Sequence, residues 1–141
     1  MQDKTFWDSN LWIYVALDVL SPPEVAKQNV LLNMLSKHPH LVSSAQVFNE
    51  VGNVLQRKYK YSEERTARFF GKIDELTHCI PLTKDLSFKA LDLKARYQLS
   101  WFDSLIVAAA LEAECDILYT EDLHDGLVIE QTLTVKNPFT L

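Results

Sequence analysis

Glycine is scarce in this chain of 141 residues, which contains only Gly52, Gly71 and Gly126. The loops that cradle phosphates in nucleotide-binding proteins need several closely spaced glycines. Both common kinds of glycine-rich loop are therefore excluded. The chain is also too short for an eight-stranded α/β barrel. Its length fits a single domain over residues 1–141, with enough chain to bury one core.

Cysteine is also scarce, and long apolar runs and an excess of basic residues are missing. Cys79 and Cys115 show no metal-ligand spacing, so we expect two buried, reduced thiols. No apolar run approaches the ~20 residues that span a bilayer, and the charged residues Asp3 and Lys4 interrupt any N-terminal signal-peptide core. The formal charge of −5 argues against a broad basic surface for binding nucleic acid. We therefore expect a cytoplasmic protein without membrane contact.

Short apolar segments alternate with longer amphipathic segments along the whole chain. We expect strands at residues 5–7, 41–44, 79–82, 117–120 and 133–135. Helices are expected between them, near residues 10–20, 22–37, 47–55, 62–76, 83–95 and 102–113. The alternation predicts a three-layer α/β/α fold around a central parallel sheet of about five short strands.

Acidic residues stand at the ends of these buried segments. Asp8 follows the first expected strand, Asp103 opens a helix, and Asp122 follows the fourth strand; Glu50 lies beside the apolar stripe of its helix. Ligands in open parallel sheets bind beyond the carboxyl ends of the strands. If the four carboxylates converge there, their repulsion requires a cation, and hard divalent metals prefer oxygen ligands. The pattern is typical of metal-dependent phosphoryl transfer.

Each acid also has a simpler explanation. Asp8 and Asp103 both occupy positions where an acid caps or opens a helix, and Ser100 to Asp103 resembles a capping box. Glu50 alone fits a solvated helix flank. In the loop that follows Thr120, Glu121, Asp122 and Asp125 compete for the inward position, so that the sequence leaves the fourth acid open. We therefore rest the metal-site hypothesis on the four acids jointly.

One basic segment interleaves cations with aromatic residues. Arg57, Lys58 and Lys60 alternate with Tyr59 and Tyr61. Such a segment suits phosphate contacts and base stacking. Cations also stabilise a helix C-terminus, and the tyrosines can serve packing alone. Both interpretations stay open at this point.

Several motifs, in their order and spacing, carry a resemblance that spans essentially the whole chain. They are residues 6–12 (FWDSNLW), 49–55 (NEVGNVL), 102–110 (FDSLIVAAA), 115–123 (CDILYTEDL) and 137–139 (NPF). With these motifs the chain resembles a PIN domain, the ribonuclease fold of VapC-type toxins from bacterial toxin–antitoxin pairs. The tryptophan before Asp8, where leucine is commoner, is a minor departure from the family pattern.

The resemblance implies a function and a set of site residues. It implies a metal-dependent endoribonuclease that is the toxin of a type II toxin–antitoxin system, with Mg²⁺ or Mn²⁺ held by Asp8, Glu50, Asp103 and Asp122. Asn10 and Thr120 match supporting positions. The implied partners are an RNA substrate, a cognate antitoxin protein and a second copy in a homodimer.

Two alternatives compete with this hypothesis. A non-catalytic binding module could keep the fold and use the acids structurally, although all four acids are intact. A phosphatase of the haloacid dehalogenase kind would also end its first strand in an aspartate. Such an enzyme needs a second aspartate two positions later, and this chain has Asn10 there.

Overall fold

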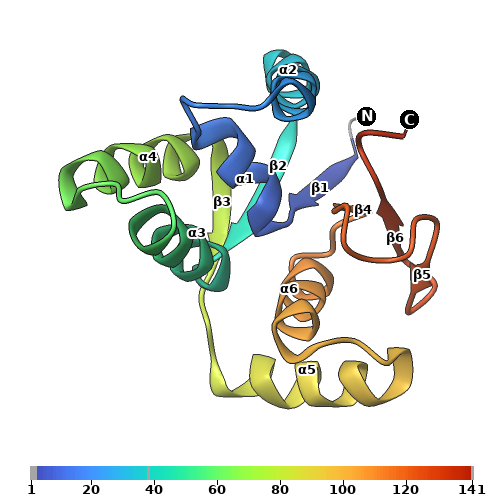
Figure 1. The fold of residues 1–141 in the computed structure, drawn as a ribbon. Coiled ribbons are helices and arrows are strands. Elements are labelled where there is room, and N and C mark those ends of the chain that lie inside the picture. Colours follow the sequence, from blue (N-terminus) through green and yellow to red (C-terminus); the bar gives the residue numbers. More distant parts are fainter. Residues whose placement is uncertain (1–2, 38, 141) are drawn as a thin grey trace.

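The computed structural model describes residues 3–37 and 39–140, which form one sheet with helices on both of its faces (Figure 1). The strands are β1 (Lys4–Trp7), β2 (His40–Ser44), β3 (Thr77–Ile80), β4 (Ile117–Tyr119), β5 (Val128–Ile129) and β6 (Leu133–Lys136). The helices are α1 (Ser9–Ala16), α2 (Pro22–Ser36), α3 (Ala45–Arg57), α4 (Glu63–Leu76), α5 (Lys84–Tyr97) and α6 (Trp101–Glu112).

The strand order is β3-β2-β1-β4-β6-β5, and only the short β5 runs antiparallel to its neighbour. β1 pairs in parallel with β2 on one side and with β4 on the other. The chain leaves β1 toward β2 and β3, then returns through α5 and α6 to β4. The sheet therefore changes direction between β1 and β4, and this is the place where open α/β sheets bind ligands.

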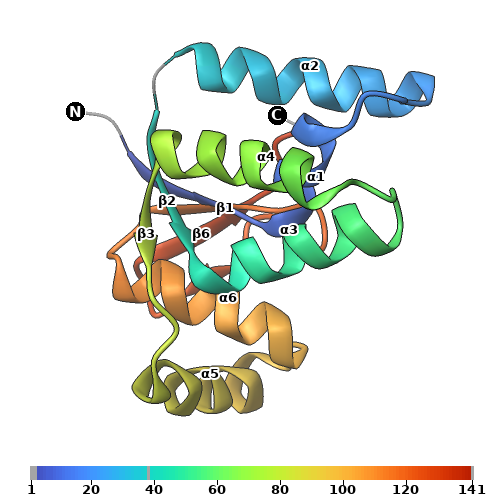
Figure 2. The ribbon, with the colours of Figure 1, turned by 90° about the vertical axis from the view of Figure 1, so that its left-hand side faces the viewer.

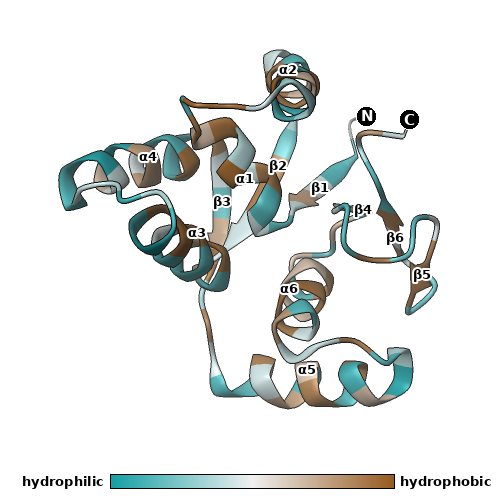
Figure 3. Ribbon diagram, in the orientation of Figure 1, coloured by the Kyte–Doolittle hydropathy of each residue, from teal (hydrophilic) through white to brown (hydrophobic). Residues whose placement is uncertain are grey.

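Helices cover both faces of the sheet, as the two perpendicular views show (Figure 2). α1, α3 and α4 lie together on one side, and α6 lies on the other with α5 outside it. α6 is the most deeply embedded, because every residue from Ser104 to Ala110 is buried. Hydrophobic colour dominates α1 and gathers in α6, whereas the outer turns of α4 are hydrophilic (Figure 3). The three-layer α/β/α prediction is confirmed.

Local sequence explains where the helices begin. Ser21, Ser44, Ser62, Thr83 and Ser100 each accept a backbone N–H of the following turn and act as N-caps of α2 to α6. On the α1 face, the rings of Trp7 and Trp12 pack with centroids 4.9 Å apart. That contact fixes α1 against the end of β1, so that the residues between them are held at the edge of the sheet.

Several details differ from the sequence predictions. The first helix was expected to reach residue 20 but ends at Ala16, because the backbone becomes extended at Leu17. β3 begins at Thr77 and not at Cys79, because the chain passes directly from α4 into extended backbone without a connecting loop. β5 was not predicted, since two residues carry no periodicity; its antiparallel pairing makes the sheet mostly rather than wholly parallel. Cys115 is buried as expected, whereas Cys79 is only half-buried; both are free thiols.

Within the described ranges, no helix combines the length and the apolar character that crossing a membrane requires.

Candidate functional site

A pocket of about 570 Å³ opens beyond the carboxyl ends of β1 and β4. All four of the predicted acids line it, together with residues of α1, α3 and α6. The lining residues are Asp8, Ser9, Asn10, Ile13, Gln46, Asn49, Glu50, Asn53, Val54, Phe102, Asp103 and Asp122. The pocket thus combines a carboxylate cluster with amide groups and a few apolar side chains.

Asp8 is the most deeply buried of the four acids, with 6% of its surface exposed. The parallel register pairs Trp7 with Tyr119 and so brings Asp8 beside Thr120. The Asp8 carboxylate accepts the Ser9 backbone N–H at 2.7 Å and the Thr120 hydroxyl at 2.8 Å. The pKa of Asp8 is raised to about 7, mainly by burial; the two hydrogen bonds oppose the rise, and the nearby charges of Asp103 and Asp122 add to it. Asp8 is therefore both the N-cap of α1 and a carboxylate that is costly to ionise without a cation.

Glu50 reaches the pocket from α3, where it is half-buried. The Ser9 hydroxyl donates to Glu50 Oε2 at 2.7 Å, and Gln46 Nε2 donates to Oε1 at 3.1 Å. Both carboxylate oxygens are thus oriented by neighbours. Ser9 connects two of the acids, because its N–H binds Asp8 while its hydroxyl binds Glu50.

Asp103 lies in the first turn of α6. Ser100 Oγ accepts the Asp103 backbone N–H at 3.1 Å, as in one half of a capping box. Across the part of the chain that the structure describes, the return bond from the Asp103 side chain to the Ser100 backbone is not formed. The capping explanation therefore accounts for the backbone of Asp103 and leaves its carboxylate to the pocket.

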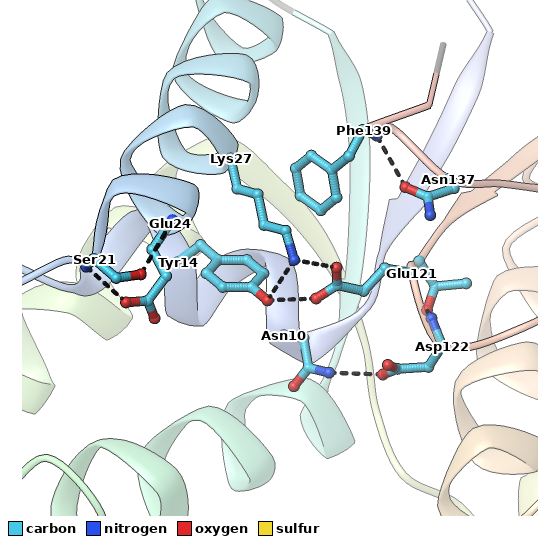
Figure 4. Close-up of polar contacts among 10 residues, drawn as sticks. Asn10, Tyr14, Ser21, Glu24, Lys27, Glu121, Asp122, Asn137 and Phe139 are labelled. Atoms are coloured by element: carbon cyan, nitrogen blue, oxygen red, sulfur yellow. Dashed lines mark hydrogen bonds and ion pairs between the residues drawn. The ribbon is translucent and has the colours of Figure 1, made fainter.

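Asp122 is the acid that the loop after β4 presents to the pocket (Figure 4). Asn10 Nδ2 donates to Asp122 Oδ2 at 2.6 Å, and the Asp122 N–H donates to Thr120 Oγ1 at 3.1 Å. Partial burial and the charges of Glu121 and Asp103 raise the pKa of Asp122, while the Asn10 bond lowers it. Asn10 and Thr120 therefore contact the acids that they were predicted to support.

The other two acids of this loop have partners elsewhere. Glu121 accepts a hydrogen bond from the Tyr14 hydroxyl at 2.5 Å and forms an ion pair with Lys27 at 2.7 Å. Asp125 accepts the backbone N–H of Asn137 at 2.8 Å. Neither lines the pocket. The choice among Glu121, Asp122 and Asp125 that the sequence left open therefore falls on Asp122 by geometry.

The basic segment at the end of α3 lies outside the pocket. Arg57, Lys58 and Lys60 are exposed. Tyr59 and Tyr61 pack against the core, and the Tyr61 hydroxyl donates to the carbonyl of Ala16 at 2.8 Å. The tyrosines thus serve packing, and the exposed cations are the part of the segment that a phosphate backbone can reach.

Several pocket residues were missed by the sequence analysis. Gln46, Asn49 and Asn53 recur at spacings of three and four residues, so they share with Glu50 the face of α3 that borders the pocket. That spacing was a signal available in the sequence. Phe102 was predicted only as part of an apolar stripe, yet 59% of its surface is exposed.

The chemistry of the donor set fits a hard divalent cation. Carboxylate and amide oxygens line the pocket, and the raised pKa of Asp8 reports unfavourable negative charge there. Within residues 3–37 and 39–140, no three acidic, histidine or cysteine side chains stand close enough together to hold a metal ion as they lie. Asp8, Glu50 and Asp122 instead accept hydrogen bonds from neighbouring side chains.

A family model for the PIN domain matches residues 5–124. No curated protein matches the chain in sequence. A toxin–antitoxin complex from Klebsiella pneumoniae has a chain with a TM-score of 0.68 and 20% identity, over 96% of this chain and 98% of that one.

Two further solved structures are similar. VapC20 from Mycobacterium tuberculosis, described as a toxin that cleaves the sarcin–ricin loop, has a TM-score of 0.68 and 14% identity over 84% of this chain and 92% of its own. VapBC2 from Rickettsia felis, bound to a DNA fragment from its promoter, has a TM-score of 0.63 and 16% identity over 94% and 97%. At these identities the similarity establishes the fold.

Proposed function

Because the chain belongs to the PIN domain family, we propose that it is a metal-dependent endoribonuclease and the toxin of a type II toxin–antitoxin pair. One observation carries the proposal. Asp8, Glu50, Asp103 and Asp122, which come from four separate elements of the chain, line a single pocket. Membership of the PIN domain family argues against a haloacid-dehalogenase-like phosphatase. The intact acids favour an enzyme over a non-catalytic module of the same fold.

Mg²⁺ or Mn²⁺ would be held by these four carboxylates. When bound, the ion supplies positive charge that offsets the carboxylates and the RNA phosphate and makes water a stronger nucleophile. The residues of the chain do the positioning. Ser9 and Thr120 fix the two oxygens of Asp8, Gln46 orients Glu50, and Asn10 orients Asp122.

The uncharged donors also set the charge balance of the pocket. Ser9, Asn10, Gln46 and Thr120 contribute hydrogen bonds without adding positive charge. No cationic side chain lines the pocket among the residues described. The negative charge of the acids is therefore not offset by any described side chain that lines the pocket. An RNA phosphate, which is also negative, can approach the acids only when a cation is bound between them.

The same charge balance favours a partner with a cationic side chain. We propose that a cognate antitoxin protein inhibits the enzyme by inserting such a side chain among the acids, since opposite charges steer and orient association. Two of the similar structures are toxin–antitoxin assemblies. α2 also exposes Val25, Val30 and Leu32, which offers apolar surface to the antitoxin or to a second protomer of a homodimer. The two free thiols support a reducing compartment, the cytoplasm.

Cleavage of total RNA tests the proposal. Purified protein is incubated with bacterial RNA in Mn²⁺, in Mg²⁺ and in EDTA, beside the variant Asp8→Asn, and the new RNA ends are sequenced. We expect discrete new ends with the wild-type protein in the presence of metal, and none with EDTA or with Asp8→Asn. Equal cleavage by Asp8→Asn, or in EDTA, would overturn the metal-site assignment. RNA binding without cleavage would favour the non-catalytic module.

A further inference from the structure

Phe102 is an exposed aromatic side chain that lines the pocket of the four acids. It lies in the first turn of α6, directly before Asp103, and 59% of its surface is open to solvent. The residues that follow it, from Ser104 to Ala110, are all buried. Exposed apolar side chains are common on protein surfaces, and Phe88 is more exposed than Phe102. Phe102 differs because it lines the pocket beside the four acids. Its position at the rim of the carboxylate cluster therefore calls for a function other than core packing.

The helix that borders the other side of the pocket presents amides. Asn49 and Asn53 are one turn apart on α3, and both are exposed where they line the pocket. Amide side chains donate and accept hydrogen bonds and match the edges of nucleobases. The pocket therefore offers an aromatic face and an amide edge next to the four acids.

Charge decides which part of a nucleotide these groups can receive. Phosphates carry negative charge and suit only the cation that the acids require. A nucleobase is uncharged, has two π faces and a polar edge, and matches Phe102 together with Asn49 and Asn53. Because Phe102 and Asp103 are consecutive and line the same pocket, the base that reaches Phe102 belongs to a nucleotide next to the phosphate at the acids.

We infer that Phe102 is the stacking platform for a nucleobase adjacent to the scissile phosphate, and that Asn49 and Asn53 contact the edge of that base. This inference rests on the proposed ribonuclease function and adds a specificity-determining residue to it. The base must leave its own stack to reach Phe102. Cleavage therefore selects RNA positions where unstacking costs little, and the base identity next to the cut depends on Phe102 and the two amides.

The test compares substitutions that separate an aromatic face from apolar volume. Phe102→Ala removes both, Phe102→Leu keeps apolar volume without a π face, and Phe102→Trp keeps the face. Phe88→Ala is the matched control, since Phe88 is 67% exposed on α5 and does not line the pocket. Cleavage is measured on a random-sequence single-stranded RNA pool and on total bacterial RNA with Mn²⁺, and Mn²⁺ affinity is measured without RNA.

We expect Phe102→Ala and Phe102→Leu to lower kcat/KM by about 5- to 150-fold, the range that base–aromatic stacking provides. Phe88→Ala should stay at the wild-type level, and Phe102→Trp, which keeps an aromatic face, should lose much less activity than Phe102→Ala or Phe102→Leu. The base preference beside the cut should broaden in Phe102→Ala, while Mn²⁺ affinity stays unchanged. In the Asp8→Asn background, where RNA is bound without being cut, 2-aminopurine beside the cleavage site should be quenched, and Phe102→Ala should abolish the quenching.

The outcomes distinguish this inference from the proposed function. If the wild-type protein cuts RNA and Phe102→Ala cuts it equally well at the same positions, the stacking platform is wrong and the ribonuclease stands. Activity retained by Phe102→Leu would show that apolar contact suffices and would also reject stacking. Weakened Mn²⁺ binding in Phe102→Ala would make Phe102 a support for Asp103. Absence of cleavage by the wild-type protein in either RNA would reject the proposed function itself.

Discussion

Lys27 of α2 and Glu121 of the loop after β4 form an ion pair with 2.7 Å between Nζ and Oε2, although 94 residues separate them in the chain. The Tyr14 hydroxyl donates to the same carboxylate, and the Lys27 ammonium also lies over the rings of Tyr14 and Phe139 (Figure 4). The contact turns Glu121 away from the pocket while its neighbour Asp122 lines it. α2 is thereby tied to the loop that carries one of the four acids.

A double-mutant cycle measures the energetic coupling between Lys27 and Glu121. Lys27→Met and Glu121→Gln should each lower the free energy of unfolding by about 1 kcal/mol, because both side chains are partly buried and each loses a charged partner. The double variant should lose less than the sum, with a coupling energy of about 0.5 to 2 kcal/mol in urea unfolding. Additive losses would contradict the coupling. Lys89→Met is the control, since the Lys89–Glu112 pair is longer, at 3.9 Å, and more exposed.

The acids of the last loop should differ sharply in their effect on cleavage. Asp122→Asn should lower RNA cleavage by at least about 100-fold, the upper end of the effect of residues that support a metal site. Asp125→Asn should leave it nearly unchanged, because the asparagine oxygen can still accept the Asn137 N–H. Initial rates of cleavage with Mn²⁺ check both variants. A large loss of cleavage in Asp125→Asn would show that Asp125 belongs to the site and would contradict the choice of Asp122.

The stability of the metal-free protein should depend on pH through Asp8. Its pKa is about 7 in the folded chain against an ordinary value of 3.8, so that between these values the folded state keeps a proton that the unfolded state has lost. The contribution is therefore fully present below pH 4 and is lost as the pH rises to about 7.

Asp8→Asn should accordingly be more stable than the wild type at pH 8 by on the order of 1 to 4 kcal/mol. The difference in the free energy of unfolding between Asp8→Asn and the wild type should be smaller at pH 5. Urea unfolding in EDTA at the two pH values measures it, and comparison with the variant removes the contributions of other titrating groups. A difference that does not change with pH would show that the Asp8 pKa is not raised. Added Mn²⁺ should stabilise the wild type more than the variant.

Two helical glycines should respond oppositely to the same substitution. At Gly71 of α4 an added Cβ meets nothing within 4 Å, whereas at Gly52 of α3 it meets the Phe70 ring at 2.8 Å. Gly71→Ala should therefore stabilise the protein by about 0.5 to 1 kcal/mol through helix propensity. Gly52→Ala gains the same helix propensity but must also displace the Phe70 ring. The free energy of unfolding of Gly52→Ala should therefore be about 1 to 3 kcal/mol lower than that of Gly71→Ala. Equal effects in thermal and urea unfolding would refute the close contact between α3 and α4.

The basic segment after α3 should contribute to RNA affinity through charge alone. Replacing Arg57, Lys58 and Lys60 together with glutamine should reduce the slope of log K against log salt by up to about 2, at roughly 0.7 per phosphate contact on single strands. The measurement is RNA binding by the Asp8→Asn protein over a salt series. Replacing Lys84, Lys89 and Lys94 of α5 removes the same charge elsewhere. An equal fall in slope for both triple variants would show that net charge matters and the segment does not.

Features that depend on residues close together in the chain were predicted from the sequence, whereas contacts between residues far apart in the chain were not. Helix starts and the first two strands follow from local signals such as Ser62 and the apolar run at residues 41–44, and these were predicted well. β3 was placed two residues late because Thr77 both ends α4 and opens the strand. Asp8, Asp103 and Asp122 were proposed because each stands at the end of an element, and Glu50 was proposed because it flanks the apolar stripe of its helix.

The arrangement around the acids was beyond local reasoning. Nothing near Glu121 indicates that Lys27, 94 residues earlier, neutralises it. For that reason local patterns left the choice among Glu121, Asp122 and Asp125 open, and only the resemblance to PIN domains favoured Asp122. Ser9 looked only like a cap residue, and its bond to Glu50 crosses 41 positions. Contacts of this range come from tertiary packing, which periodicity and propensity do not encode.

The central position of β1 has a consequence for synthesis. Asp8 is bonded to Thr120 across 112 positions, and Thr120 is in turn held by β6 through the Lys136 carbonyl. At about 5 to 20 residues per second, a ribosome takes roughly 6 to 22 seconds between the two partners. Once residue 44 has been made, β1 can pair with β2 on one side, but β4 is still missing on the other. Asp8 and Asp122 therefore cannot line a common pocket until residue 122 has been synthesised, and a shorter nascent chain lacks the complete set of four acids.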